Sequence, residues 1–377
     1  MGKVNAERQC RENIKVTFIA DQMRSGGAER VVANLSSEFV TLGCTVSIIM
    51  LNETSNHCEY PVDSEVKLIP VKRIYHGNNP IQKILLLRKC VKENDPDVLI
   101  SFQNHAHVYA YCASLGLNIP HIVSERSDPG QYPKDRITRV LRRYIFRKAS
   151  GCVFQTDGAR SFFSGEIQRK SEVIPNPVVL MYEPQKLIHR EKKITAAGGL
   201  TAPKNYDMMV RAFALFSERN PGYKLIICGE GNLRGDIEKL IDELSLTDSV
   251  VLKGQVCNPH EEIFDSSVFV LSSDFEGMPN SLLEAMALGV PVVSTDCPCG
   301  GPSEVIKNNE NGILVPTGDI KAMAEAIEAI IRNKEFSDRL SEKAQRVRQE
   351  FSLPIIAERW LVYIGGIIIK PSESITG

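Results

Sequence analysis

Two glutamates, Glu276 and Glu284, stand eight residues apart in the segment FEGMPNSLLEAMALGVPVV. An apolar run, VFVLSSD, precedes them and another, PVVST, follows, so we expect two buried strands joined by a loop and a helix. One carboxylate then lies on the strand-to-helix loop and the other about one turn into the helix, where ligands bind open α/β sheets. The spacing suits glycoside hydrolysis poorly, because that reaction needs two carboxyl groups about 5–9.5 Å apart across one bond. Two hydrogen-bonding roles on one extended ligand fit better, and the alternative is a loop glutamate and a solvated helix glutamate.

Two further loops have residues suited to a phosphate group. Gly26 and Gly27 follow a predicted strand and open a helix, whose free N–H groups favour an anion. Lys204, followed by Asn205, lies at another helix start in AAGGLTAPKNYDMMVRAF, where its ammonium group would face a phosphate. The alternatives are a glycine turn that only connects two elements and a solvated lysine.

Other segments give weaker signals. The segment GEGNLRG, which begins at Gly229, resembles a dinucleotide fingerprint but has its glycines at the wrong spacing. Residues 297–305, CPCGGPSEV, form another glycine turn at a helix start. Arg126 follows a predicted strand and would face the ligand, for charge neutralisation or acceptor recognition; the alternative is an ordinary surface arginine.

These loops belong to an alternation of strands and helices along the whole chain. Strands are predicted over 14–20, 45–51, 66–71, 97–102, 121–125 and 152–156, and then over 193–198, 223–229, 250–254, 268–273, 291–295 and 312–315. Helical patterns such as 28–42, 206–219, 320–332 and 337–351 lie between them. The alternation predicts an α/β protein with two Rossmann-like, doubly wound domains, residues 1–175 and 176–353, facing a central cleft that holds the ligand.

Composition narrows the class of protein. The chain is 43% hydrophobic, and no run of 18 apolar residues indicates a transmembrane helix. Its first residues are polar, so we expect no secretory signal, and its ten cysteines form no C-x-x-C pair. We therefore expect a reduced, cytoplasmic protein with no metal site and no cofactor.

The net charge of −1 hides a basic segment. Residues 1–175 carry a charge of +6 and residues 176–377 a charge of −7, and residues 134–148, KDRITRVLRRYIFRK, hold seven cations and one acid. Within this segment apolar residues recur at helical spacing: Ile137, Val140, Leu141, Tyr144 and Ile145. Such a helix can make peripheral contact with an anionic membrane, and the alternative is a core helix with a cationic outer face. A nucleic-acid partner is not expected, because no aromatic residues interleave a basic patch.

The motifs together resemble those of glycosyltransferase family 4 over essentially the whole chain. They are GGAER, the Lys-Asn pair after a glycine strand end, GEG-x-L-R, the FEG to EAMALGVPVV segment, GG-P-x-E and NGILV. The resemblance implies the GT-B architecture and a metal-independent transfer of a sugar from a nucleotide diphosphate with retention of anomeric configuration.

The resemblance also implies roles for individual residues. Lys204 would neutralise the diphosphate, Glu276 would contact the donor sugar, and Glu284 would bind the ribose hydroxyls. Lys204, Glu276 and Arg126 form the expected catalytic set. The expected donor-binding set is Gly26, Gly27, Lys204, Asn205, Gly229, Gly277, Met278, Pro279, Asn280, Ser281 and Glu284. The last helix, residues 354–369, would cross back to the first domain.

Two positions depart from the family pattern. Family members commonly carry G-R-L before the lysine, whereas this chain reads Gly198-Gly199-Leu200. They also often have a histidine in the loop after the fifth strand, where this chain reads Ser124-Glu125-Arg126. The first departure weakens the leaving-group clamp or moves that task to another cation.

The predicted activity is transfer of a hexose or N-acetylhexosamine, with UDP as the default base, to a saccharide acceptor. The acceptor would be lipid-diphosphate-linked, in surface polysaccharide or glycan assembly at the inner face of the cytoplasmic membrane. The alternatives are a transferase for a soluble or protein acceptor, a UDP-sugar epimerase, and a nucleotide-sugar binder without catalysis.

Overall fold

The chain forms two compact units. The computed structural model describes residues 13–24, 26–56, 58–74, 79–181 and 189–369. The first unit comprises Met1–Pro177 with Leu353–Gly377, and the second comprises Val178–Ser352. The seam predicted after residue 175 and the domain end predicted at residue 353 lie close to these boundaries.

The first unit is built on a parallel sheet of seven strands in the order β3-β2-β1-β4-β5-β6-β7. The strands are Lys15–Ala20 (β1), Thr45–Met50 (β2), Lys67–Pro70 (β3), Val98–Phe102 (β4), His121–Ser124 (β5), Gly151–Phe154 (β6) and Ser171–Val173 (β7). The central strand β1 pairs with β2 and β4, with Val16 opposite both Val46 and Val98. Its buried run of apolar residues on both faces is typical of a strand covered by helices on two sides.

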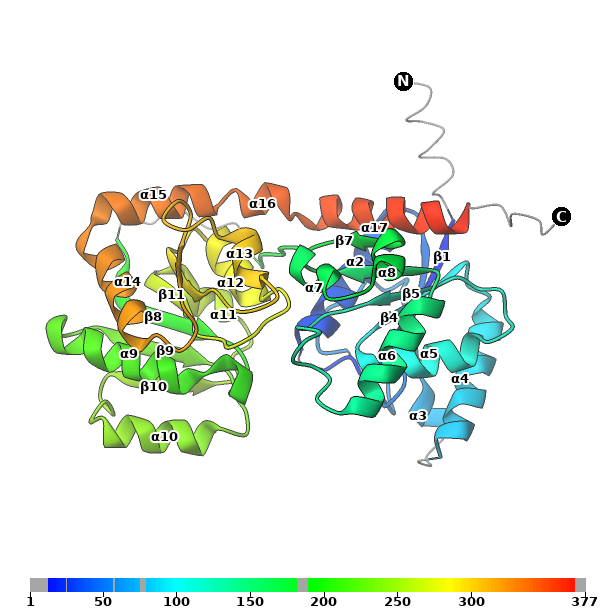
Figure 1. Ribbon diagram of the computed structural model, residues 1–377, viewed down its shortest axis with the longest axis horizontal. Coiled ribbons are helices and arrows are strands. Elements are labelled where there is room, and N and C mark those ends of the chain that lie inside the picture. Colours follow the sequence, from blue (N-terminus) through cyan, green and yellow to red (C-terminus); the bar gives the residue numbers. More distant parts are fainter. Residues whose placement is uncertain (1–12, 25, 57, 75–78, 182–188, 370–377) are drawn as a thin grey trace, which may run out of the picture. The chain divides into compact units, whose positions relative to one another are not determined.

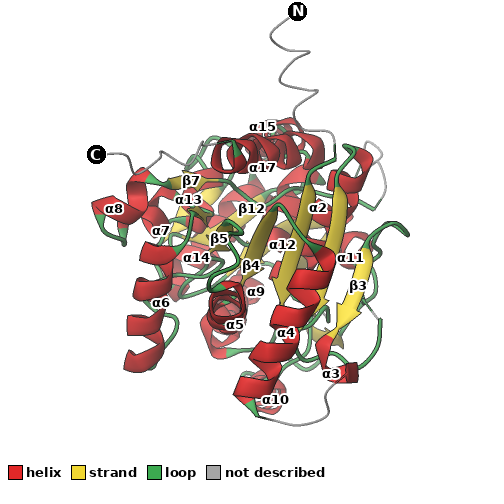
Figure 2. Cartoon of the chain, turned by 90° about the vertical axis from the view of Figure 1, so that its right-hand side faces the viewer, coloured by secondary structure: helices red, strands yellow, loops and turns green. Residues whose placement is uncertain are grey.

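Helices cover both faces of this sheet. Figure 2 shows α4, α5 and α6 side by side on one face, and α17 packs beside α2. The helices are Gly27–Thr41 (α2), Val71–Ile74 (α3), Pro80–Asn94 (α4), Asn104–Ser114 (α5), Arg136–Lys148 (α6), Asp157–Ser161 (α7), Gly165–Arg169 (α8) and Leu353–Ile368 (α17).

The last helix, α17, is fixed to the first unit by specific contacts. Trp360, which is fully buried, stacks on Phe102 with the ring centroids 5.9 Å apart. The Tyr363 hydroxyl accepts a hydrogen bond of 2.8 Å from the Cys152 amide. The helix α17 therefore completes the core of the first unit.

The second unit has a parallel sheet of six strands in the order β10-β9-β8-β11-β12-β13. The strands are Glu191–Ala197 (β8), Lys224–Cys228 (β9), Val250–Gly254 (β10), Ser266–Leu271 (β11), Val292–Thr295 (β12) and Ile313–Val315 (β13). Its helices, shown in Figure 1, are Ala202–Lys204 (η1, a 3-10 turn), Tyr206–Arg219 (α9), Arg234–Glu243 (α10), Pro259–Phe264 (α11), Asn280–Ala287 (α12), Gly301–Val305 (α13), Ile320–Arg332 (α14), Lys334–Ala344 (α15) and Val347–Glu350 (α16). Separate apolar cores fill its two faces, one under α9, α10 and α14 and the other under α11 and α12.

Side-chain caps fix where several helices begin. The Asn205 side chain accepts from the Met208 amide at 3.1 Å, and the Asp319 side chain accepts from the Ala322 amide at 2.9 Å. Such caps satisfy N–H groups that have no partner inside the helix. The helices predicted over 206–219 and 320–332 begin at the residues that follow these caps.

The structure departs from the sequence-based elements in two places. The strand β7 was not predicted, since three residues at a sheet edge give too short a pattern. The single helix expected over 337–351 is two helices, α15 and α16, separated at Gln345 and Arg346. In the described part of the chain every helix is too short or too polar to cross a bilayer.

Two buried histidines share one hydroxyl in the first unit. The Ser101 Oγ atom lies 2.7 Å from His107 Nδ1 and 2.7 Å from His121 Nε2. Burial lowers the pKa of both rings, that of His121 to about 4, and the charges of His121 and Arg142 lower the pKa of His107 further. The fold therefore contains both imidazoles in their neutral form at neutral pH.

We expect two of the seven histidine rings to stay neutral well below the ordinary pKa of 6.5. A lowered pKa means that the folded state resists protonation. The contribution of His121 to stability is thus complete above pH 6.5 and is lost as the pH falls toward about 4, and that of His107 is lost in the same direction. An NMR pH titration of ring-labelled histidines tests this, with the urea-unfolded chain as the control. Seven midpoints equal to those of the unfolded chain would contradict it.

Candidate active site

Lys204 and Glu276 meet where the winding of the second sheet reverses. Lys204 lies in the loop after β8 and Glu276 in the loop after β11, and these neighbouring strands are continued in opposite directions. Ligands of doubly wound sheets bind at such a reversal, beyond the carboxyl ends of the strands. The Lys204 ammonium group donates to Glu276 Oε1, and their side chains are 22% and 14% exposed. The structure thus brings together two of the three residues expected to be catalytic.

Hydrogen bonds to backbone carbonyl groups join the two loops that carry this pair. The Ser272 hydroxyl donates to the Lys204 carbonyl at 2.8 Å, and the Asp274 amide donates to the Pro203 carbonyl at 2.8 Å. The Ser273 hydroxyl donates to Glu276 Oε1 at 2.7 Å. The lysine and the carboxylate are therefore held in position before any ligand arrives.

Asn205 has two structural hydrogen bonds in addition to its predicted role toward the donor. Its side chain caps α9 and also donates to Asp274 Oδ1 at 2.7 Å. Its φ angle of 45° lies in the left-handed region, which asparagine tolerates better than most residues. Asn205 consequently shapes the turn that places Lys204.

Glu284 lies on the second turn of α12 and is almost completely buried. Its side chain is 6% exposed, and its Oε2 atom lies 3.3 Å from Nε2 of the buried His260. His260 belongs to the first turn of α11, whose cap is Asn258. The imidazole ring thus lies beside the carboxylate, and a contact with ribose would use the small exposed part of Glu284.

The loop between β11 and α12 is packed closely against the turn before α13. Pro279 precedes the first helical residue, Asn280, and Met278 is part of the apolar core. A Cβ atom on Gly301 would lie 1.8 Å from the Gly277 carbonyl oxygen. Only glycine at position 301 allows this approach of two backbones, so the turn at 297–301 supports the Glu276 loop. Ser281, the second helical residue, completes the stretch of predicted donor contacts.

Gly229 is also placed by a close approach of backbones. Its φ angle is 148°, and a Cβ atom there would lie 2.0 Å from the Gly198 carbonyl oxygen. The neighbouring Leu200 amide donates to the Glu230 carbonyl at 2.9 Å. The GEG segment therefore supports the loop that leads to Lys204.

The winding of the sheet also reverses in the first unit, and this reversal brings Glu29 and Gln103 together. The winding reverses between β1 and β4; Gly26, Gly27 and Glu29 follow β1, and Gln103 follows β4. The Gln103 amide donates to Glu29 Oε1 at 2.6 Å. Burial raises the pKa of Glu29, against its hydrogen bonds with its own backbone amide and with Gln103. This pair could not be predicted from the sequence, in which Glu29 is only a possible helix cap.

The Glu29 carboxylate explains the glycine at position 26. A Cβ atom on Gly26 would lie 2.1 Å from Glu29 Oε2, and the Gly26 amide donates to the Tyr60 hydroxyl at 3.1 Å. The space beside Gly26 is thus filled by a carboxylate of this chain. Gly26 contributes the shape of the loop, and its N–H group is already engaged.

Arg126 packs on an aromatic ring at the carboxyl edge of the first sheet. Its guanidinium group lies 4.8 Å from the Phe102 ring centroid and donates to Asn176 Oδ1. Part of its side chain reaches solvent, whereas Nε is fully enclosed. Burial lowers the pKa of Arg126 to about 9, and the charge of Glu125 acts against this. Arg126 remains a cation at neutral pH.

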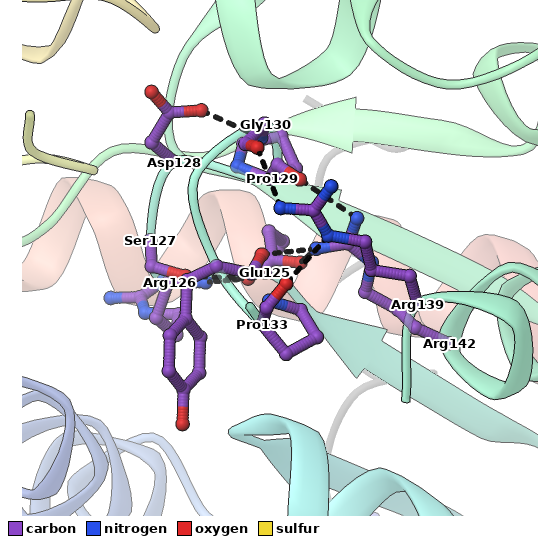
Figure 3. A network of polar contacts seen from close by, with 10 residues as sticks. Glu125, Arg126, Ser127, Asp128, Pro129, Gly130, Pro133, Arg139 and Arg142 are labelled. Atoms are coloured by element: carbon purple, nitrogen blue, oxygen red, sulfur yellow. Dashed lines mark hydrogen bonds and ion pairs between the residues drawn. The ribbon is translucent and has the colours of Figure 1, made fainter. Parts of the chain in front are cut away.

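The loop that carries Arg126 is anchored by a buried ion pair. Arg142 of α6 donates to Glu125 Oε2 at 3.2 Å, and both side chains are 3% exposed. Arg142 also donates to the carbonyls of Tyr132 and Pro129, at 2.6 and 2.8 Å. Figure 3 shows this network, in which Arg139 adds hydrogen bonds to Pro133 and Gly130. Burial raises the pKa of Glu125, and Arg142 opposes this shift.

Comparison with known families identifies the class of this protein. Residues 25–181 match the family described as "Glycosyltransferase Family 4", and residues 182–347 match "Glycosyl transferases group 1". The chain therefore belongs to the family-4 glycosyltransferases, as its motifs predicted, and it is a glycosyltransferase with the GT-B fold. Among the described residues no three His, Cys, Asp or Glu side chains gather into a metal-binding group.

Individual relatives narrow the comparison. A Campylobacter jejuni α-1,4-N-acetyl-D-galactosaminyltransferase, named for an acceptor on diphospho-undecaprenol, is 29% identical over 94% of this chain and 99% of its own length. A second C. jejuni enzyme, a 4-α-N-acetylgalactosaminyltransferase for another diphospho-undecaprenol saccharide, is 26% identical over 93% of this chain and 100% of its own length. The fold matches that of Anabaena HepE solved with UDP and glucose, with a TM-score of 0.78, 14% identity and coverage of 94% of this chain and 100% of that one.

We expect Gly301→Ala to destabilise the second unit by about 1–3 kcal/mol, as for other overpacked sites. It should also weaken nucleotide binding, because the added Cβ pushes the Gly277 carbonyl and with it the Glu276 loop. Thermal unfolding with and without UDP measures both effects. Gly235→Ala is the matched control, since a Cβ there meets nothing within 4 Å, and equal behaviour of the two variants would contradict the prediction.

Proposed function

We propose that this glycosyltransferase moves a hexose or N-acetylhexosamine from a UDP-sugar to a saccharide on a lipid-diphosphate carrier. The observation that carries the proposal is the pair Lys204 and Glu276, held at the reversal of the second sheet. The cation can neutralise the diphosphate of a nucleotide-sugar, and the carboxylate can accept hydrogen bonds from the hydroxyl groups of the sugar. The proposed transfer retains the anomeric configuration and uses side-chain cations in place of a metal ion.

The charges that develop during transfer define the tasks of the residues. The bond between sugar C1 and the diphosphate oxygen breaks, leaving positive charge on the sugar ring and negative charge on the departing diphosphate. Lys204 stabilises that negative charge, which is the kind of electrostatic assistance that lowers a barrier most. A bond forms between C1 and an acceptor hydroxyl oxygen on the same face, and the hydroxyl proton passes to the departing phosphate. The products are UDP and the extended saccharide.

Glu276 contacts the donor sugar in this proposal, and Glu284 binds the ribose. The Ser273 hydroxyl donates to Glu276, so this carboxylate is oriented before the donor binds, and the His260 ring lies 3.3 Å from the Glu284 carboxylate. The backbone from Gly277 to Ser281 and the turn at Asn205 line the donor, and Gly229 shapes the loop behind them. Gly26 and Gly27 shape the loop after β1 in the first unit, which is a further proposed contact of the donor.

Arg126 is the proposed contact from the first unit to the acceptor side. A guanidinium group can bind a phosphate oxygen in a bidentate manner, which suits an acceptor that itself carries a diphosphate. The printed names of both C. jejuni relatives include such an acceptor. A lipid carrier also implies peripheral contact with the inner face of the cytoplasmic membrane. A soluble or protein acceptor is the second candidate, and one structural relative is named a pneumococcal O-GlcNAc transferase.

We expect UDP to stabilise the protein against heat, and GDP and ADP to do so weakly or not at all. A ligand at 100 times its dissociation constant adds about 2.7 kcal/mol of stability, which is readily detected. Glu284→Ala should abolish the shift, whereas Glu325→Ala, on the exposed side of α14, should keep it. No stabilisation by any nucleotide in the unaltered protein would refute the donor site.

We expect Lys204→Ala to lower the transfer rate by a factor of about 10² or more, the usual effect of removing one group that stabilises developing charge. The measurement is release of UDP in the presence of membrane extract, with Lys224→Ala at the start of β9 as the control. Transfer at the unaltered rate in the Lys204 variant would remove this lysine from the mechanism.

A further inference from the structure

The helix α6 exposes four of the five apolar residues of its sequence pattern, and the fifth, Ile145, is buried. Ile137 is 75% exposed, Val140 63%, Leu141 42% and Tyr144 48%. We call these four residues the apolar stripe. The helix packs on the core through Ile145 and Phe146, and its outer side carries these four apolar residues as well as cations. An exposed set of large apolar side chains on one helix is a common mark of an interaction surface.

Cations border the apolar stripe. Arg136, Arg143, Arg147 and Lys148 are all exposed on the same helix, and α6 contains no acidic residue. An apolar stripe with a basic border is the pattern of helices that lie in the interface of an anionic bilayer. A second copy of this chain is a poor occupant, since a symmetric contact would bring the same cations together.

The opposite side of α6 holds the loop that contains Arg126. Arg142 lies on that side and is buried, with hydrogen bonds to Glu125 and to the Tyr132 and Pro129 carbonyls. Figure 3 shows the Arg139 and Arg142 side chains directed at this loop. Because α6 begins just after the loop, the apolar stripe starts near the edge of the sheet where β5 ends. The helix α6 and the loop that contains Arg126 are therefore connected by hydrogen bonds, so that a shift of the helix shifts the loop.

We infer that α6 docks on an anionic bilayer through its apolar stripe and basic border, and that the link from Arg142 to Glu125 transmits docking to the Arg126 loop. This inference rests on the proposed lipid-linked acceptor and identifies the surface that meets its membrane. The apolar stripe enters the interface and the arginines contact lipid phosphates. Docking then sets the height of the Arg126 loop above the membrane surface, where a carrier diphosphate lies.

The single tryptophan of the chain reports on this link. Trp360 stacks on Phe102, and the Arg126 guanidinium group lies 4.8 Å from the same Phe102 ring. A change in the position of Arg126 alters the surroundings of Phe102 and, through it, those of the indole. Trp360 fluorescence can thus follow the loop without any knowledge of the acceptor.

The first experiment is co-sedimentation with phosphatidylcholine vesicles, with and without phosphatidylglycerol. We expect binding to the anionic vesicles alone, weakened by salt, and a loss of at least tenfold in the triple variant I137S/V140S/L141S. Leu215→Ser, at a residue of α9 with 38% exposure, is the control and should bind as the unaltered protein does. Absence of vesicle binding, or equal binding by the triple variant, overturns the docking surface, while UDP stabilisation reports separately on the donor site.

The second experiment tests the link to the loop. We expect anionic vesicles to change the Trp360 emission of the unaltered protein, and Glu125→Gln to bind vesicles equally while losing that change. Arg139→Gln, at an exposed residue that holds the Pro133 and Gly130 carbonyls, serves in the same way if Glu125→Gln does not fold. An unchanged emission of the unaltered protein on docking, or the same change in the folded variant, overturns the link.

Discussion

The geometry of a parallel sheet is the constraint on which this protein depends. All strands of such a sheet end at one edge, and where the winding reverses, two adjacent loops turn away from each other and leave room for a ligand. In the second unit this reversal separates β8 from β11, and the space receives Lys204 from one loop and Glu276 from the other. In the first unit the reversal separates β1 from β4, and Glu29 and Gln103 meet there. The sheet thus makes neighbours of residues that are distant in sequence, and hydrogen bonds between the loops of the second unit hold them in place.

The ion pairs at the carboxyl edges of the two sheets position loops and side chains more than they add to the free energy of unfolding. A buried ion pair such as that of Glu125 and Arg142 gives little net stabilisation, because removing both groups from water costs about as much as their attraction returns. The role of this pair is to position the loop, since three hydrogen bonds from the Arg142 guanidinium group attach the loop that contains Arg126 to the helix α6. The pair of Lys204 and Glu276 is more exposed, so water and salt screen it and a polar ligand can replace either partner at low cost.

The sequence predicts the fold well and the site in part, for identifiable reasons. The helices α9 and α14 were predicted with their observed ends, because caps and apolar spacing are local signals. Lys204 was singled out by its position after a strand, and Glu276 and Glu284 by their places on the loop and helix that follow another strand. His260 and Gln103 were missed because their contacts join residues far apart in the chain, whereas Ser273 was missed although it lies only three residues before Glu276. The exposure of the apolar stripe on α6 could not be predicted either, since spacing reveals an apolar side but not what covers it.

The glycine loops of the second unit differ in how much change they tolerate. At Gly229 and Gly231 a side chain would collide with the backbone of the 198–200 loop, so these positions are closed to variation. Gly199 is unlike them, because a Cβ atom there meets its nearest neighbours, the Glu230 carbonyl and the Thr201 methyl group, at 3.7 Å, an ordinary contact distance. The chain thus lacks the family arginine at a position that has room for it. A side chain can therefore be introduced at residue 199 while the surrounding backbone stays intact, which makes this residue a natural point of entry for altering the enzyme.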